Sequence, residues 1–127
     1  MILAAKDNAI NQKVIRQLLI RLGFEADLVA NGAEAVAATG RKKYDLILMD
    51  IQMPVMDGIQ AMKKIRAGAQ PVPRIVALTA NALSDDRARL LAEGFDDYLS
   101  KPIPVRLLEE MIERQCQLIL SRDQRIQ

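Results

Sequence analysis

Short apolar segments alternate along the chain with longer segments of helical periodicity. The apolar segments predict β-strands at residues 1–5, 25–30, 44–49, 74–78 and 97–100. After each of them, apolar residues recur every three or four positions, which is typical of amphipathic helices. These helices are expected at residues 9–22, 33–41, 59–67, 83–93 and 105–120. The alternation predicts an α/β fold in which a parallel sheet carries helices on both faces.

Local patterns predict where several of these elements begin and end. The first helix should pack on the sheet through one apolar stripe, made of Ile10, Val14, Leu18 and Leu22 with Ile15 and Leu19 beside them. Asn8 is expected to cap the start of this helix. Asn31 and Gly32 are expected to form a turn before the second helix. Residues 1–120 should form one domain, and the polar tail of residues 121–127 should fray.

The third strand ends in an acid. Its four successive apolar residues, 46–49, suit a strand that is covered on both faces. Asp50 follows them, and Pro54 and Gly58 indicate a loop after it. The carboxyl end of a central parallel strand is where open α/β sheets bind their ligands. A helix-capping or turn aspartate would look the same, so this segment alone favours neither interpretation.

Polar residues follow the other strands as well, and they should converge with Asp50 because parallel strands end at one edge of the sheet. They are Lys6 and Asp7 after the first strand, Thr79 after the fourth and Lys101 after the fifth. Asp50 and Asp7 could hold a divalent cation, or Asp50 could be a nucleophile for a phosphoryl group. The Thr79 hydroxyl and the Lys101 ammonium would suit the oxygens of such a group.

Composition narrows the possible functions. The 127 residues are 50% hydrophobic and 27% charged, which is ordinary for one globular domain. A net charge of +2 is too small to indicate a nucleic-acid or membrane surface. With no histidine and only Cys116, the chain cannot form a Ser-His-Asp triad or an internal disulfide, and a zinc site is not expected. The absence of a secretory signal favours a cytoplasmic location.

Five sequence blocks resemble the receiver domain of two-component response regulators, especially those attached to hybrid histidine kinases. The blocks lie at residues 6–11, 31–32, 48–58, 77–82 and 94–102, and the resemblance covers roughly residues 2–115. The most specific are Leu-Met-Asp-Ile-Gln-Met-Pro-Val-Met-Asp-Gly at 48–58 and Gly-Phe-Asp-Asp-Tyr-Leu-Ser-Lys-Pro at 94–102. The resemblance implies a five-stranded, doubly wound, flavodoxin-like fold with the strand order 2-1-3-4-5.

The resemblance also implies a function. Asp50 would accept a phosphoryl group from a phosphohistidine on a histidine kinase or a histidine phosphotransfer domain. Asp7, Asp50 and the main-chain carbonyl of Gln52 would hold Mg²⁺.

Thr79 and Lys101 would bind the phosphoryl oxygens, and Tyr98 would act with Thr79 as a switch. The helix at 83–93, the fifth strand and the last helix would form the output face, through which the domain could dimerise.

Lys6 departs from the family pattern, which has an acid at this position. With an acid there, three carboxylates and one lysine leave two surplus negative charges, which one Mg²⁺ cancels. With Lys6, two carboxylates face two ammoniums, and no metal is needed for neutrality. A charge pair about 4 Å apart contributes on the order of 4 kcal/mol at an effective dielectric constant near 20. We therefore expect weakened Mg²⁺ binding and weakened phosphorylation, unless the Lys6 side chain points into the solvent.

Two other functions compete with phosphoacceptance. The chain could be a receiver-like interaction module that no longer takes phosphate, and labelling with a small phosphodonor would separate the two. An unrelated flavodoxin-like enzyme is less well supported, because residues 7–10 do not form a glycine-rich phosphate loop. We expect no independent activity on a free substrate, and we expect the chain to be part of a longer hybrid kinase.

Overall fold

The strands form one parallel sheet in the order β2-β1-β3-β4-β5, which confirms the predicted topology. The structure is a computed structural model, and it describes residues 2–6, 9–51, 56–68, 73–79, 84–100 and 105–126. Within these ranges the strands are β1 (Ile2–Ala5), β2 (Ala26–Val29), β3 (Leu46–Asp50), β4 (Arg74–Thr79) and β5 (Asp97–Ser100).

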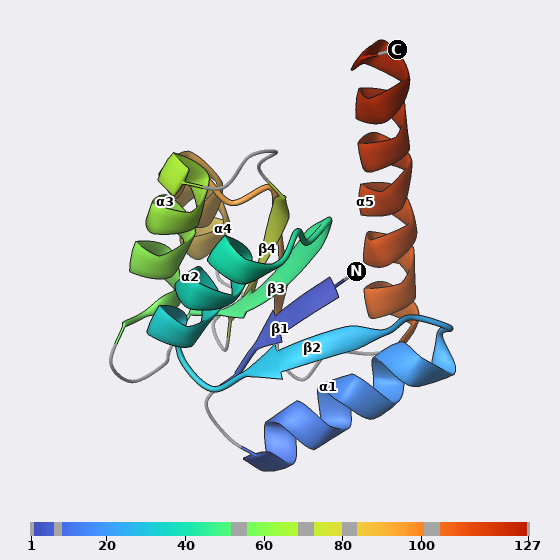
Figure 1. The fold of residues 1–127 in the computed structure, drawn as a ribbon, viewed down its shortest axis with the longest axis horizontal. Coiled ribbons are helices and arrows are strands. Elements are labelled where there is room, and N and C mark those ends of the chain that lie inside the picture. Colours follow the sequence, from blue (N-terminus) through green and yellow to red (C-terminus); the bar gives the residue numbers. More distant parts are fainter. Residues whose placement is uncertain are drawn as a thin grey trace.

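Helices cover both faces of this sheet, as the doubly wound fold requires (Figure 1). They are α1 (Ala9–Arg21), α2 (Gly32–Arg41), α3 (Gly58–Gly68), α4 (Ser84–Glu93) and α5 (Val105–Ile126). Residues of α2, α3 and α4 pack on one face, and residues of α1 and α5 pack on the other. Helix α5 continues to Ile126, so the chain is helical through most of the segment predicted to fray.

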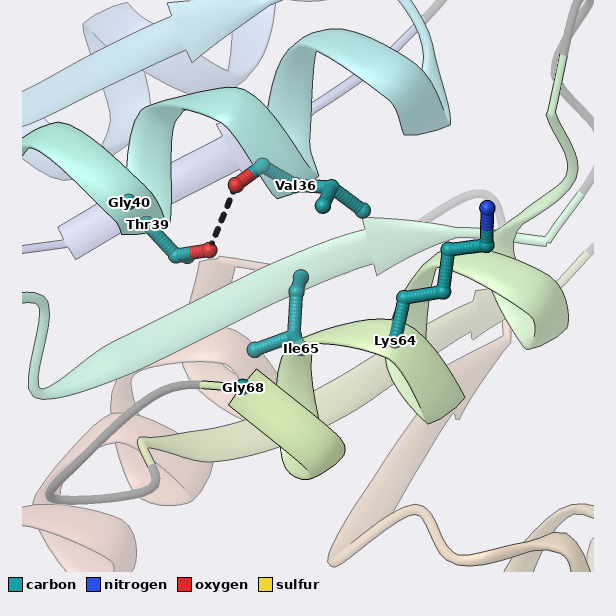
Figure 2. Close-up of a pocket in the computed structure, with 6 residues that line it drawn as sticks. All are labelled: Val36, Thr39, Gly40, Lys64, Ile65 and Gly68. Carbon is teal, nitrogen blue, oxygen red and sulfur yellow. Dashed lines mark hydrogen bonds between the residues drawn. The ribbon is translucent and has the colours of Figure 1, made fainter.

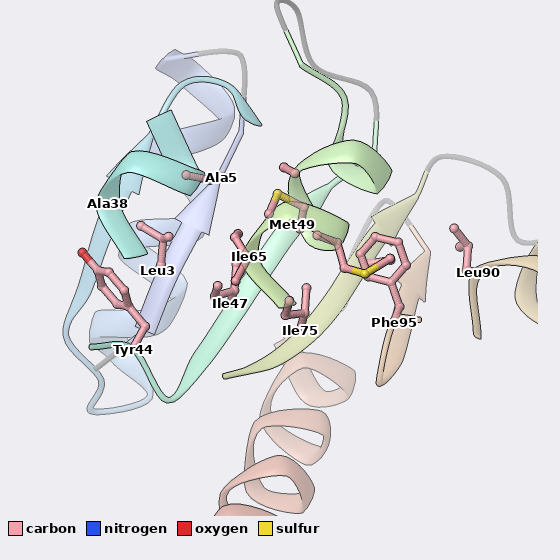
Figure 3. Packing of buried hydrophobic residues seen from close by; sticks show 14 residues of the cluster. Leu3, Ala5, Ala38, Tyr44, Ile47, Met49, Ile65, Ile75, Leu90 and Phe95 are labelled. Carbon is pink, nitrogen blue, oxygen red and sulfur yellow. The ribbon is translucent and has the colours of Figure 1, made fainter. Parts of the chain in front are cut away.

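The core has two halves because side chains alternate between the faces of each strand. Leu3, Ile47 and Ile75 point into the half beneath α2, α3 and α4 (Figure 3). The residues next to them in sequence, such as Leu48 and Val76, belong to the half beneath α1 and α5. All five residues of β3 are buried, as its continuous apolar run predicted.

Helix α1 departs from its predicted packing. Ile15 and Leu19 are buried against the sheet, whereas Ile10 is 73% exposed and Val14 is 52% exposed. Residues spaced by four rotate about 40° further around a helix at each step, because a turn contains 3.6 residues. The predicted stripe therefore drifts around α1, and its first half faces away from the core.

The predicted turn at Asn31 and Gly32 is the start of α2. The Asn31 side chain accepts a hydrogen bond from the Glu34 amide at 2.8 Å, and the Glu34 side chain accepts one from the Ala30 amide at 3.1 Å. This arrangement resembles a capping box, although Glu34 reaches the amide of the residue before the N-cap. The Gly32 amide donates to the Met56 carbonyl at 3.1 Å, and a Cβ at Gly32 would collide with that oxygen. The glycine thus holds α2 against the connection between β3 and α3.

Candidate functional site

Asp50 is the last residue of the central strand β3 and is only 2% exposed. It pairs with Leu78 of β4, and the Ile51 amide donates to the Leu78 carbonyl at 3.1 Å. Asp57 instead lies at the start of α3, where its side chain accepts a hydrogen bond from the Gln60 amide at 2.8 Å. Asp50 is therefore a buried strand-end carboxylate, and the helix-cap interpretation is wrong.

Thr79 ends the neighbouring strand β4 at the same edge of the sheet. It is buried and lies one residue beyond the partner of Asp50, opposite Ser100 of β5. Tyr98 pairs with Ala77 and packs against the core half beneath α2, α3 and α4. Because Ala77 and Thr79 are two positions apart on one strand, Tyr98 and Thr79 belong to the same face of the sheet.

The Lys6 backbone extends β1 by one residue. Its amide donates to the Val29 carbonyl of β2 at 3.0 Å, and its carbonyl accepts a hydrogen bond of 2.7 Å from Gln12 Nε2. The same Nε2 donates to the Val29 carbonyl at 3.1 Å. The Gln12 side chain of α1 therefore bonds to the carbonyls of both Lys6 and Val29 and holds the end of β1 beside β2. Nothing in the sequence pattern marked this glutamine, because its role depends on the tertiary contact.

Lys6 lies beside Asp50 across the two strands. Ala5 pairs with Met49, so the next residue of each strand comes opposite the other. Neighbouring strands are about 4.8 Å apart, and alternation directs both side chains to the face that carries α1 and α5. Lys6 is only 7% exposed, and Asp50 is the one buried carboxylate among the side chains that the structure describes. The site therefore places a buried lysine next to a buried aspartate, and burial of both charges is tolerated best when they are close.

Gly58 brings the start of α3 back onto the end of β3. Its amide donates to the Ile51 carbonyl at 3.0 Å, and a Cβ at Gly58 would collide with the Asp50 carbonyl oxygen. A side chain there would push the connection away from the acid. The candidate site thus depends on a glycine that was predicted only as a loop residue.

The remaining predicted site residues, Asp7, Gln52 and Lys101, lie outside the described residues, as does Asn8. Among the side chains that the structure describes, no group of three or more acidic, histidine or cysteine residues could hold a metal. The strand end opposite Asp50 contributes an ammonium, whereas Mg²⁺ prefers oxygen ligands. Asp50 is the one predicted metal ligand whose position the structure describes.

A hollow between α2 and α3 takes no part in this site (Figure 2). It has a volume of about 210 Å³ and is lined by Val36, Thr39, Gly40, Lys64, Ile65 and Gly68. Most of these residues come from the second halves of the two helices, and none was predicted to take part in function. The Thr39 hydroxyl donates to the Val36 carbonyl at 2.8 Å within its own helix.

Comparison with known proteins identifies this arrangement. Residues 2–113 match the response regulator receiver domain family. The chain belongs to this family. The match confirms the predicted family. Receiver domains take part in two-component phosphorelays with histidine kinases and histidine phosphotransfer proteins.

Relatives with similar sequences are long sensor kinases. Over 127 aligned residues the receiver domain is 39% identical to hybrid signal transduction histidine kinase I of Dictyostelium discoideum, covering 93% of this chain and 7% of that protein. Over 115 residues it is 43% identical to sensor protein GacS of Pseudomonas syringae pv. syringae, covering 87% of this chain and 13% of that protein. The chain thus spans a small fraction of these relatives. No helix in the part described here is long and apolar enough to cross a bilayer.

Solved receiver domains have the same fold. One, from a sensor histidine kinase of Pseudomonas aeruginosa PAO1, has a magnesium ion coordinated in its active site cleft; it is 46% identical, with a TM-score of 0.80 over 90% of this chain and 94% of that one. Another belongs to a response regulator of Saccharomyces cerevisiae and was crystallised with a histidine phosphotransfer protein. It is 35% identical, with a TM-score of 0.80 over 87% of this chain and 84% of that one.

Proposed function

We propose that this receiver domain accepts a phosphoryl group on Asp50 from a phosphohistidine of a histidine kinase or a histidine phosphotransfer domain. The observation that carries the proposal is a buried carboxylate at the end of the central strand, with Thr79 ending the next strand beside it. Thr79 and Lys101 bind the phosphoryl oxygens. Tyr98, on the same face as Thr79, moves with it as the switch residue.

The face of α1 that leaves the core supports docking of such a partner. Ile10 and Val14 are exposed in the first half of this helix, which begins close after the end of β1. The helix carries basic but no acidic residues. Exposed aliphatic side chains beside positive charges suit a partner with an apolar, acidic surface. The yeast receiver that was crystallised with a phosphotransfer protein supports a partner of this class.

Lys6 weakens Mg²⁺ binding at this site. The metal would be held by Asp7, Asp50 and the Gln52 carbonyl, as the family resemblance implies, and a related receiver domain has a magnesium ion in its active site cleft. A repulsive unit charge about 4 Å from a divalent cation costs on the order of 8 kcal/mol at an effective dielectric constant near 20, which corresponds to several orders of magnitude in affinity. The small exposure of Lys6 argues against the alternative in which its side chain reaches water. Phosphorylation that relied on bound Mg²⁺ would be slowed accordingly.

Labelling with acetyl phosphate tests the phosphoacceptor function. The phosphorylated fraction is measured on a phosphate-affinity gel, for the native domain and for Asp50→Asn. We expect a retarded band in the native protein that is absent from the variant. If the native protein shows no retarded band either with or without added metal, the result would favour the second candidate, a receiver-like interaction module.

The remaining features follow from this assignment. We place the domain in the cytoplasm and expect it not to contact nucleic acid or membrane directly. Its output face consists of α4, β5 and α5. Leu91 on α4 and Leu107 on α5 are 40% and 48% exposed, which supports dimerisation through this face.

A further inference from the structure

We infer that the domain takes its phosphoryl group without a divalent cation, because the Lys6 ammonium supplies the positive charge that a metal supplies elsewhere in the family. This inference rests on the proposed phosphoacceptor function. It goes beyond that function because it assigns a cation to the transfer and predicts insensitivity to metal removal.

Charge balance supports the replacement of Mg²⁺ by the Lys6 ammonium. Replacing an acid by Lys6 adds two positive charges to the site, which equals the charge of one Mg²⁺. After transfer, the acyl phosphate on Asp50 carries about two negative charges, and Asp7 carries one. Lys6 and Lys101 then leave one surplus negative charge. A family site with an acid at position 6 reaches the same balance only when Mg²⁺ is bound.

The backbone geometry directs the Lys6 side chain to the face of the sheet that carries Asp50. Lys6 is tied to β2 through its amide, and its carbonyl is held by Gln12. Its side chain leaves the sheet on the same face as the side chain of Asp50 and is almost fully buried. A lysine ammonium is a compact point charge that binds phosphate oxygens well. A charge held at the site before transfer stabilises the transferring group without reorganisation.

The transfer step needs no reactant besides the phosphodonor and water. A carboxylate oxygen of Asp50 forms a bond to phosphorus while the bond from phosphorus to the donor nitrogen breaks. The leaving nitrogen keeps the electron pair of that bond and takes a proton from water. Negative charge on the three equatorial oxygens is met by the ammonium groups of Lys6 and Lys101.

The test measures initial rates of Asp50 labelling by phosphoramidate in metal-free buffer and in excess MgCl₂. We expect equal rates for the native domain. Lys6→Met should lose about a hundredfold in metal-free buffer, as expected when one preorganised charge is removed from a transition state. Lys6→Asp should label only with Mg²⁺. Lys43→Met, which alters an exposed lysine before β3, should behave like the native protein.

A second readout does not depend on turnover. In metal-free buffer, ¹⁹F NMR should show trifluoroberyllate bound to the native domain but not to Lys6→Met or Asp50→Asn. Circular dichroism shows whether each variant is folded.

Labelling of the native domain that requires Mg²⁺ would overturn the inference and leave the phosphoacceptor function intact. Unimpaired metal-free labelling of folded Lys6→Met would do the same. Absence of labelling under both conditions would overturn both.

Discussion

Replacing Asp96 should destabilise the domain more than any other single change at the amino-terminal edge of β4 and β5. One of its carboxylate oxygens accepts hydrogen bonds from Arg66 Nη2 at 2.7 Å and from the Ile75 amide at 2.8 Å. The other lies 3.4 Å from Arg74 Nη1. The acid thereby joins α3, β4 and the start of β5.

The expected magnitude follows from these contacts. A hydrogen bond to a charged group contributes about 1.5–3 kcal/mol, and a buried amide left without a partner costs about 1–3 kcal/mol. Arg66 and Arg74 keep 30% and 28% of their side chains exposed, so solvent screens the ionic part. We expect Asp96→Ala to lower the free energy of unfolding by about 3 kcal/mol. For a domain of this size, that lowers Tm by roughly 10 °C.

Urea denaturation followed by circular dichroism measures this loss. Asp96→Asn is the matched control, because an amide oxygen can still accept from the Ile75 amide. It should lose about half as much, since a neutral hydrogen bond contributes about 1 kcal/mol. A loss below about 1 kcal/mol for Asp96→Ala would refute the reasoning, because such a value is typical of exposed ion pairs.

Three further changes probe other parts of the structure. Gly58→Ala should destabilise the domain and slow acetyl phosphate labelling, because the added Cβ meets the Asp50 carbonyl; urea denaturation and gel shifts measure both. Hydrogen bonds from Tyr44 and Lys42 lower the pKa of Asp27, while burial and the bond to Asp27 raise the pKa of Tyr44 to about 12. The stabilisation from the contact between Tyr44 and Asp27 should therefore disappear as pH falls below about 4 and as pH rises from about 10 to about 12. In urea titrations, Tyr44→Phe should flatten the dependence of the unfolding free energy on pH in both ranges. Val14→Asp should slow transfer from a phosphotransfer protein yet leave labelling by acetyl phosphate unchanged.

Patterns that depend on local chemistry predicted the fold well. The buried run before Asp50 and the alternation of strands and helices required a parallel sheet covered on both faces. The strand order itself came from the family resemblance. Periodicity predicted that α1 is amphipathic but not which turn of it meets the sheet, since a stripe drawn through every fourth residue drifts around the helix. For this reason the prediction that Ile10 and Val14 pack on the sheet was wrong.

Features of the site that depend on contacts between distant segments could not be predicted. The position of Lys6 in sequence indicated a missing acid, but its burial depends on the register between β1 and β3. Gln12 gave no signal, because a glutamine in the first turns of a helix is ordinary surface. Gly58 could have been marked by the tight Asp57-Gly58 pair, although its contact with the Asp50 carbonyl requires the folded loop.

Mapping the acceptor residue tests the central claim most directly. A phosphorylated histidine phosphotransfer domain is mixed with the receiver, the acyl phosphate is reduced with borohydride, and the modified residue is located by mass spectrometry. The proposed function predicts homoserine at position 50 and no phosphate on the Asp50→Asn protein. Reduction at another aspartate, or no loss of phosphate from the donor, would contradict it.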